Sequence, residues 1–133
     1  MPPRTITRGG SSSSGGPGGT GGGQGKAERY MKPSLLLALR EGRARYGYDL
    51  LTTIQEYGFV QGKAPPGMVY RHLRQLEEEG LVTSSWQTED AGPAKRIYEI
   101  TADGLDALTG WTDFMEQQAQ SLLRFVKRYR ALS

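Results

Sequence analysis

Residues 64–82 read APPGMVYRHLRQLEEEGLV, and this stretch decides the fold. At 100° per residue, Val69, Leu73 and Leu76 fall within one narrow stripe of a helix. Prolines at the start of the stretch and a glycine near its end are typical of helix boundaries. The pattern predicts a helix from 66 to about 79 that packs against a core by this stripe. The opposite side carries Gly67, Arg71 and Arg74, with Tyr70 on one flank.

The neighbouring segments predict further helices and one β-hairpin. Helices are expected over 31–42, where a glycine ends an apolar run, and over 48–57. After the third helix, alternating polar and apolar residues predict strands at 81–88 and 95–101. The order helix, helix, helix, strand, strand predicts a mainly α fold with a small β-hairpin. We interpret residues 27–101 as a winged helix-turn-helix domain whose hairpin is the wing.

Residues 102–133 predict one long amphipathic helix that begins after a capping threonine. Its apolar positions follow a 3-4-3-4 spacing. About 30 helical residues would extend ~45 Å, whereas a domain of about 75 residues has a radius of gyration near ~11 Å. Because the domain cannot cover this apolar face, we expect a second copy of the chain to cover it in a homodimer. The expected dimer contacts are Leu105, Leu108, Trp111, Met115, Leu122, Val126 and Tyr129.

The N-terminal segment differs in composition from the rest of the chain. Residues 1–26 hold 10 of the 19 glycines and almost no apolar side chains. Such a segment cannot bury enough surface to offset its ordering entropy, so we expect a disordered Gly/Ser-rich tail. Three of the 17 basic residues lie in this tail, which leaves 14 basic against 14 acidic residues. The predicted domain is therefore neutral, and any nucleic-acid interface must come from local clustering of charge.

Several classes of protein are excluded by what the sequence lacks. There is no cysteine, which removes disulfides, thiolate catalysis and nearly all structural zinc sites. No apolar run approaches the roughly 20 residues of a membrane span, and we expect a cytoplasmic protein without a membrane partner. No nucleophile, base and orienting group occur together, so we predict no enzyme, no metal and no cofactor. The single histidine, His72, flanks the apolar stripe and is interpreted as structural.

The ordered motifs resemble the PadR family of transcriptional regulators. The resemblance rests on four segments: GYDL at 47–50, VYRHLRQLEEEGLV at 69–82, GPAKRIYEIT at 92–101 and ADGLDALTGW at 102–111. The resemblance covers about residues 30–130. Within the family, the single C-terminal helix is similar to the compact subgroup, and the sequence looks closest to the poly-β-hydroxybutyrate-responsive repressors.

The resemblance implies a homodimeric winged-helix repressor that binds double-stranded DNA. Its third helix would enter the major groove, its wing would approach the backbone or the minor groove, and its C-terminal helix would form the dimer. The sequence departs from the family pattern in three places. These are the Gly/Ser tail, a somewhat long connection at 58–65, and the acidic pair Glu89-Asp90 in a wing expected to face phosphate.

Basic and aromatic residues on the third helix and the wing are the candidate DNA contacts. Arginine can contact guanine O6 and N7 or a phosphate, and a tyrosine can donate to a phosphate. On the helix, the alternative is a solvated face paired with Glu77 and Glu78. In the wing, the alternative is strand-edge charge that prevents sheet-to-sheet pairing. The predicted DNA-binding residues are Tyr48, Gly67, Tyr70, Arg71, Arg74, Lys95 and Arg96.

Ligand response and the competing function are the last expectations from sequence. Trp111, Phe114 and Met115 are candidates for an effector pocket at the dimer seam, for a small molecule or a polymer; the same spacing is also that of a plain core. The leading function is a dimeric, sequence-specific DNA-binding regulator, most simply a ligand-responsive repressor. The alternative is a winged-helix protein-interaction module that dimerises without binding DNA.

Overall fold

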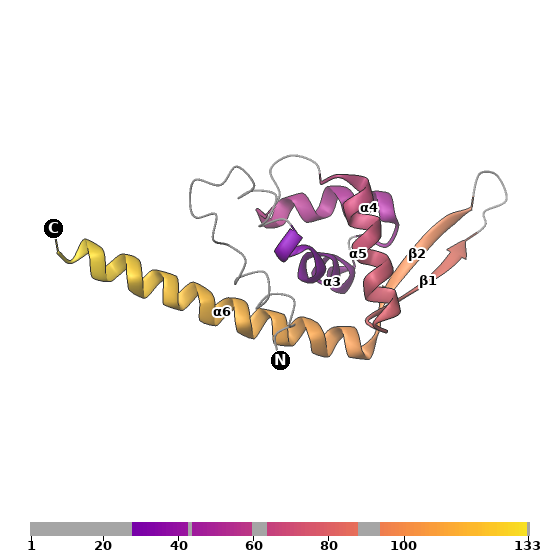
Figure 1. Cartoon of the computed structure of the whole chain (residues 1–133). Coiled ribbons are helices and arrows are strands. Elements are labelled where there is room, and N and C mark those ends of the chain that lie inside the picture. Colours follow the sequence, from indigo (N-terminus) through magenta and orange to yellow (C-terminus); the bar gives the residue numbers. More distant parts are fainter. Residues whose placement is uncertain (1–27, 43, 60–63, 88–93, 133) are drawn as a thin grey trace.

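The computed structural model describes residues 28–42, 44–59, 64–87 and 94–132, and Figure 1 shows the arrangement of the chain. In the described residues, three α-helices and one 3₁₀ turn are followed by an antiparallel hairpin and one long α-helix. The expected tail at 1–26, part of the 58–65 connection and the Glu89-Asp90 pair lie outside the described residues. The elements are α3 (Met31–Glu41), α4 (Gly47–Thr53), η2 (Ile54–Tyr57), α5 (Pro66–Glu78), β1 (Val82–Gln87), β2 (Lys95–Ile100) and α6 (Ala102–Arg130).

The second expected helix is the one that differs from its prediction. Instead of one α-helix over 48–57, α4 begins at Gly47 and ends at Thr53, and the chain continues as a 3₁₀ turn, η2. Gly58, with φ of 85°, donates its N–H to the carbonyl of Gln55. A tightened last turn satisfies carbonyls that an α-helix would leave without a partner at its end.

Helix α3 forms the centre of the core. Its residues Leu35 and Leu36 are fully buried, as the apolar run predicts. Around it pack α4, α5, α6 and β2. From α5, the stripe of Val69, Leu73 and Leu76 is fully buried, so the face that the sequence assigns to the core is the face that contacts it.

The hairpin pairs β1 with β2 in antiparallel register, from Val82 opposite Ile100 to Gln87 opposite Lys95. Tyr46 forms an isolated bridge with Ile97 beside β2. This bridge places the segment that leads into α4 at the edge of the wing. The wing and α4 therefore meet along β2.

A compact junction joins α5, the hairpin base and α6. Gly80, with φ of 79°, ends α5, and the N–H of Leu81 donates to Leu76 at 2.9 Å in the manner of a Schellman cap. The Thr101 hydroxyl donates to the Gly80 carbonyl at 2.7 Å and accepts from Gly104 N–H at 3.0 Å. A Cβ at position 104 would overlap the Leu81 carbonyl, so only glycine permits this approach. We call these four residues, Gly80, Leu81, Thr101 and Gly104, the α5–α6 junction.

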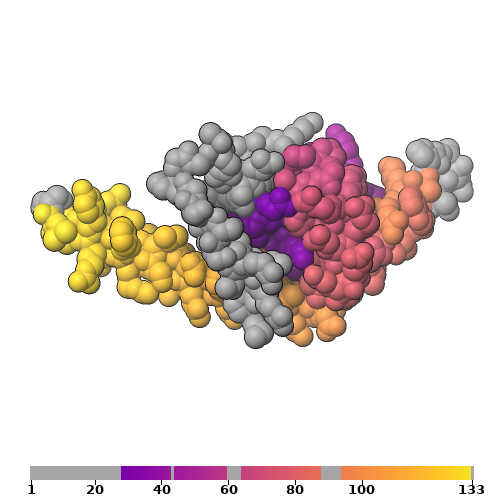
Figure 2. Space-filling model, in the orientation of Figure 1, coloured from indigo at the N-terminus to yellow at the C-terminus, as the bar shows by residue number. Residues whose placement is uncertain are grey.

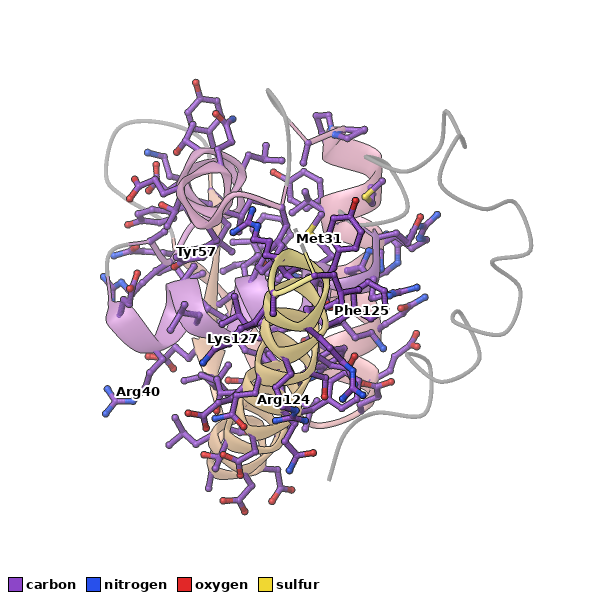
Figure 3. The ribbon with its side chains drawn as sticks, turned by 90° about the vertical axis from the view of Figure 1, so that its left-hand side faces the viewer. Met31, Arg40, Tyr57, Arg124, Phe125 and Lys127 are labelled. Carbon is purple, nitrogen blue, oxygen red and sulfur yellow. The ribbon has the colours of Figure 1, made fainter. Side chains whose placement is uncertain are left out.

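Helix α6 is packed against the domain only near its start. Leu108 and Trp111 are buried within the chain, whereas all described residues from 116 onward are exposed. Figure 2 shows the C-terminal half projecting from the rest of the molecule. Figure 3 looks nearly along this helix and places Arg124, Phe125 and Lys127 at its near end. Among the described residues, no helix combines the length and the apolar character needed to cross a bilayer.

Candidate nucleic-acid interface

The outward face of α5 carries the polar residues that the sequence assigns to DNA. Gly67, Tyr70, Arg71 and Arg74 are all exposed. At 100° per residue, Gly67 and Arg74 lie near the middle of this face, with Tyr70 on the side of the wing and Arg71 on the opposite side. The face is opposite the buried stripe, so a macromolecule that contacted these side chains would not disturb the core.

A pocket of about 390 Å³ lies where α4, α5 and β2 meet. It brings together Tyr48, Tyr70, Lys95 and Arg96, residues that the sequence predicts on three separate elements. Sequence reasoning missed the other lining residues, because none of them is basic and no pattern indicates that they meet. Their signal is positional: three of them immediately surround Tyr48, next to the bridge between Tyr46 and β2. The missed residues are Tyr46, Gly47, Asp49 and Tyr98.

Gly47 sets the position of Tyr70 in this pocket. A Cβ at position 47 would stand 2.5 Å from the Tyr70 Cε1 atom and 2.7 Å from its hydroxyl oxygen. The tyrosine ring therefore lies directly against the glycine backbone. Because the ring is the free end of a flexible side chain, a larger residue at 47 would turn Tyr70 out of the pocket rather than break the fold.

We expect Gly47→Ala to weaken DNA binding about as much as Tyr70→Ala, by at least about tenfold, because Tyr70 would lose a hydrogen bond to a charged phosphate. The free energy of unfolding in urea should change little. Titration of labelled duplex DNA followed by fluorescence anisotropy measures the affinity. The control is the double variant: Gly47→Ala added to Tyr70→Ala should have no further effect, and an additive loss would contradict this role for Gly47.

Burial gives Tyr98 a raised pKa, the neighbouring Arg96 opposing the shift. A raised pKa keeps the hydroxyl neutral at physiological pH. Neutrality matters in a pocket that would face phosphate, since a tyrosinate would repel it. Because the pKa of Tyr98 is raised in the folded state, ionisation of this group does not change the free energy of unfolding below the pKa of the unfolded chain. The free energy of unfolding begins to fall only as the pH rises through about 10, where the unfolded chain loses the proton first.

The two wing cations have different surroundings. Lys95 lies with its Nζ 5.3 Å from the centre of the Tyr46 ring, and the Tyr46 hydroxyl donates to Gln87 Oε1 at 2.8 Å. A cation over an aromatic face at an exposed site is held weakly. Lys95 therefore keeps an ammonium group that is able to meet a phosphate.

Arg96, in contrast, belongs to a network that joins the wing to α5. Its Nε donates to Ser84 Oγ at 3.0 Å, and that hydroxyl donates to Glu77 Oε2 at 2.7 Å. Its Nη2 lies 3.6 Å from Glu77 Oε1, and its guanidinium lies 5.3 Å from the centre of the Trp86 ring. Arg96 thus lines the pocket, but its guanidinium already has partners within the chain, the carboxylate of Glu77 and the hydroxyl of Ser84.

The two arginines of α5 also differ. Arg71 forms an ion pair with Glu28, a residue that precedes α3. Within the described part of the chain, Arg74 has neither a hydrogen bond nor an ion pair. Arg74 is therefore the cation of the outward face whose charge is least compensated.

His72 occupies a structural position, as the sequence indicates. Its side chain is buried, and Nδ1 lies 2.9 Å from the carbonyl oxygen of Met68. Since a carbonyl only accepts, Nδ1 carries the proton in this contact. Among the described residues there is no group of acidic, histidine or cysteine side chains able to hold a metal ion.

The residues predicted for the dimer seam separate into two groups. Leu108 and Trp111 pack inside the chain's own core, and Met115 is half-buried. Trp111 makes edge-on ring contacts with Tyr30 and Phe114, at centroid distances of 6.3 and 6.5 Å. The candidate effector residues Trp111 and Phe114 thus contact each other. The group whose side chains remain exposed is Leu105, Leu122, Val126 and Tyr129.

Comparisons with known proteins match this chain to a protein family and to a curated relative. The family model described as "Transcriptional regulator PadR-like family" matches residues 35–110. The transcriptional regulator Rv3488 of Mycobacterium tuberculosis is 32% identical over 78 residues, which are 59% of this chain and 69% of that protein.

A PadR-like transcriptional regulator from Bacillus cereus gives a TM-score of 0.64 at 21% identity, over 75% of this chain and 94% of that one. Bacillus subtilis PadR in complex with operator DNA gives a TM-score of 0.54 at 28% identity, over 63% of this chain and 47% of that one. The winged-helix fold with a long C-terminal helix, expected from the order of the elements, is confirmed.

Proposed function

This chain belongs to the PadR-like family of transcriptional regulators, and from that premise we propose that it is a dimeric, sequence-specific repressor. Helix α5 enters the major groove, and the β1–β2 wing lies on the flanking backbone. The expectation of a regulator rather than an enzyme is confirmed by the family match. The likeness to poly-β-hydroxybutyrate-responsive repressors stays a prediction.

One observation carries the proposal: candidate DNA contacts from α4, α5 and β2 converge on one side of the molecule. Tyr48, Tyr70 and Lys95 line a single pocket, and Arg74 lies on the adjoining outward face of α5. Arginine in the major groove reads guanine, while tyrosine and lysine at the groove edge hold phosphates and fix the register. The solved relative from Bacillus subtilis is in complex with operator DNA, which supports DNA as the partner of this chain.

The apolar stripe of α6 supports the dimer. At 100° per residue, Leu108, Trp111, Leu122, Val126 and Tyr129 fall on one face, within about 60°. The first two pack on the chain's own core, and the last three continue the same face where no part of the described chain covers it. An uncovered face continuous with a core is well suited to a second copy in a two-fold contact.

The proposed ligand response would act through Trp111 and Phe114. The side chains of Trp111 and Phe114 lie in mutual ring contact at the point where α6 leaves the domain. An effector that entered there would separate packed rings and alter the direction of α6. Binding of a small molecule or polymer near these rings would be detected as quenching of tryptophan fluorescence.

The proposed function is tested by asking which DNA the protein retains. Purified full-length protein is mixed with fragmented genomic DNA, and the retained fragments are sequenced. We expect enrichment of an inverted repeat whose half-sites lie about one helical turn apart, because a two-fold dimer presents two α5 helices. No enrichment, together with a protein partner that co-purifies, would support the interaction module instead.

Salt dependence gives a separate prediction. If Arg71 and Lys95 of each protomer each neutralise one phosphate, log Kobs should fall with log [salt] with a slope of about −4 for the dimer. The measurement is anisotropy with an enriched fragment between low and physiological salt. A slope near zero would contradict phosphate contacts by these residues.

A further inference from the structure

The charge of Arg71 is already engaged before any DNA is bound. Its Nη2 contacts the Oε2 atom of Glu28, which lies 43 residues earlier in the sequence. Both side chains are about half-exposed, at 48% for Arg71 and 46% for Glu28. The ion pair thus lies at the surface, on the edge of the outward face of α5.

We propose that Glu28 competes with DNA phosphate for the guanidinium of Arg71 and so limits the affinity of the protein for DNA of any sequence. The inference rests on the proposed function, since it concerns the same face. A carboxylate and a phosphate offer the same kind of charged oxygen to an arginine fork. Each protomer must therefore release Glu28 before Arg71 reaches the DNA backbone.

The surroundings of Glu28 indicate that Arg71 is the group that holds it. His72 Nε2 also lies near Glu28 Oε2, at 3.4 Å. His72 would be a charged partner for this carboxylate only if its ring were protonated, whereas the guanidinium of Arg71 is always charged. Arg71 is therefore the permanent charge partner of Glu28.

The pair is also easily separated. Exposed ion pairs are weak because water and salt screen them and because two long side chains lose freedom. When Arg71 exchanges the carboxylate of Glu28 for a DNA phosphate, it replaces one charged oxygen partner with another. The binding free energy therefore gains little from Arg71 on DNA that offers it only a phosphate. The contact therefore lowers affinity for DNA of any sequence, and operator DNA must offset this loss through other contacts, such as those of Arg74.

A double-mutant cycle tests the competition. The proteins are the full-length wild type, Glu28→Gln, Arg71→Ala and the double variant, and the probe is a labelled mixed-sequence duplex of 30 base pairs. We expect Glu28→Gln to bind this probe roughly two- to fivefold more tightly. The salt dependence should steepen by up to about one unit per protomer, because Glu28 no longer takes up a cation when it is displaced.

The controls separate competition from a general change in charge. Glu79→Gln alters the net charge equally and breaks an exposed ion pair, with Lys32 at 3.1 Å, that does not involve Arg71. It should produce a smaller gain than Glu28→Gln. In the Arg71→Ala background, Glu28→Gln should gain no more than Glu79→Gln does in the wild type.

Three outcomes would overturn the inference: no gain from Glu28→Gln, an equal gain from Glu79→Gln, or an undiminished gain without Arg71. Each of these leaves the proposed function intact, because the wild type still binds the duplex. A wild type that binds no duplex at all would instead remove the proposed function, and the inference with it. Circular dichroism confirms that the four proteins share one fold.

Discussion

Replacing Arg74 with alanine should weaken operator binding at least about 30-fold. A bidentate arginine–guanine contact discriminates by about 1–3 kcal/mol, and a dimer makes the contact twice. Arg74 is the residue for this role because it lies at the middle of the outward face of α5 and has no described ion pair or hydrogen bond to give up. Fluorescence anisotropy with an enriched fragment measures the loss.

The comparison of two DNA probes distinguishes base reading from phosphate contact. If Arg74 reads a base, the loss is large on the operator and small on a mixed-sequence duplex. If it holds a phosphate, both affinities fall equally. Arg128→Ala removes an exposed arginine from α6 and serves as the matched control. Full operator affinity in Arg74→Ala would contradict the proposed orientation of α5.

Placing glutamates at Leu122 and Val126 together should convert the dimer to a monomer and reduce operator affinity more than ~100-fold. The two side chains are 66% and 38% exposed in the single chain. A partner helix would bury them, and a buried unpaired carboxylate is strongly unfavourable. A monomer reaches only one half-site, so the operator is bound far less tightly.

Light scattering at micromolar concentration measures the oligomeric state of this variant. The matched control places two glutamates at Gln117 and Gln120, which lie on α6 away from the apolar stripe and are exposed. This control adds the same charge and should stay dimeric. A wild type that is monomeric, or a Leu122/Val126 variant that remains a dimer, would contradict the proposed contact.

Periodicity predicted the elements because burial of one face leaves a local pattern. The stripe of Val69, Leu73 and Leu76 placed α5 to within one residue of its end. The split of the second helix into α4 and η2 was not predictable, since it depends on how the last carbonyls are satisfied. Periodicity also cannot tell which molecule covers a stripe, so Leu108 and Trp111 looked the same as Leu122.

The site was only partly predictable because its contacts are not local. Cations and tyrosines on α5 and the wing stood out by residue type. Asp49 and Tyr98 did not, since only the fold brings them beside Tyr70. The pairing of Glu28 with Arg71 joins residues 43 positions apart, and no sequence pattern reports it.

The α5–α6 junction connects the helix that would read DNA to the helix that would form the dimer. Hydrogen bonds through Thr101 and the close approach of Gly104 fix the start of α6 to the end of α5, so a rotation of one helix would be transmitted to the other. In a dimer, the angle between the two α6 helices would then set the distance between the two α5 helices. DNA demands about 34 Å between successive turns of one groove. A ligand that changed the crossing angle of α6 would release the operator without touching any residue that contacts it.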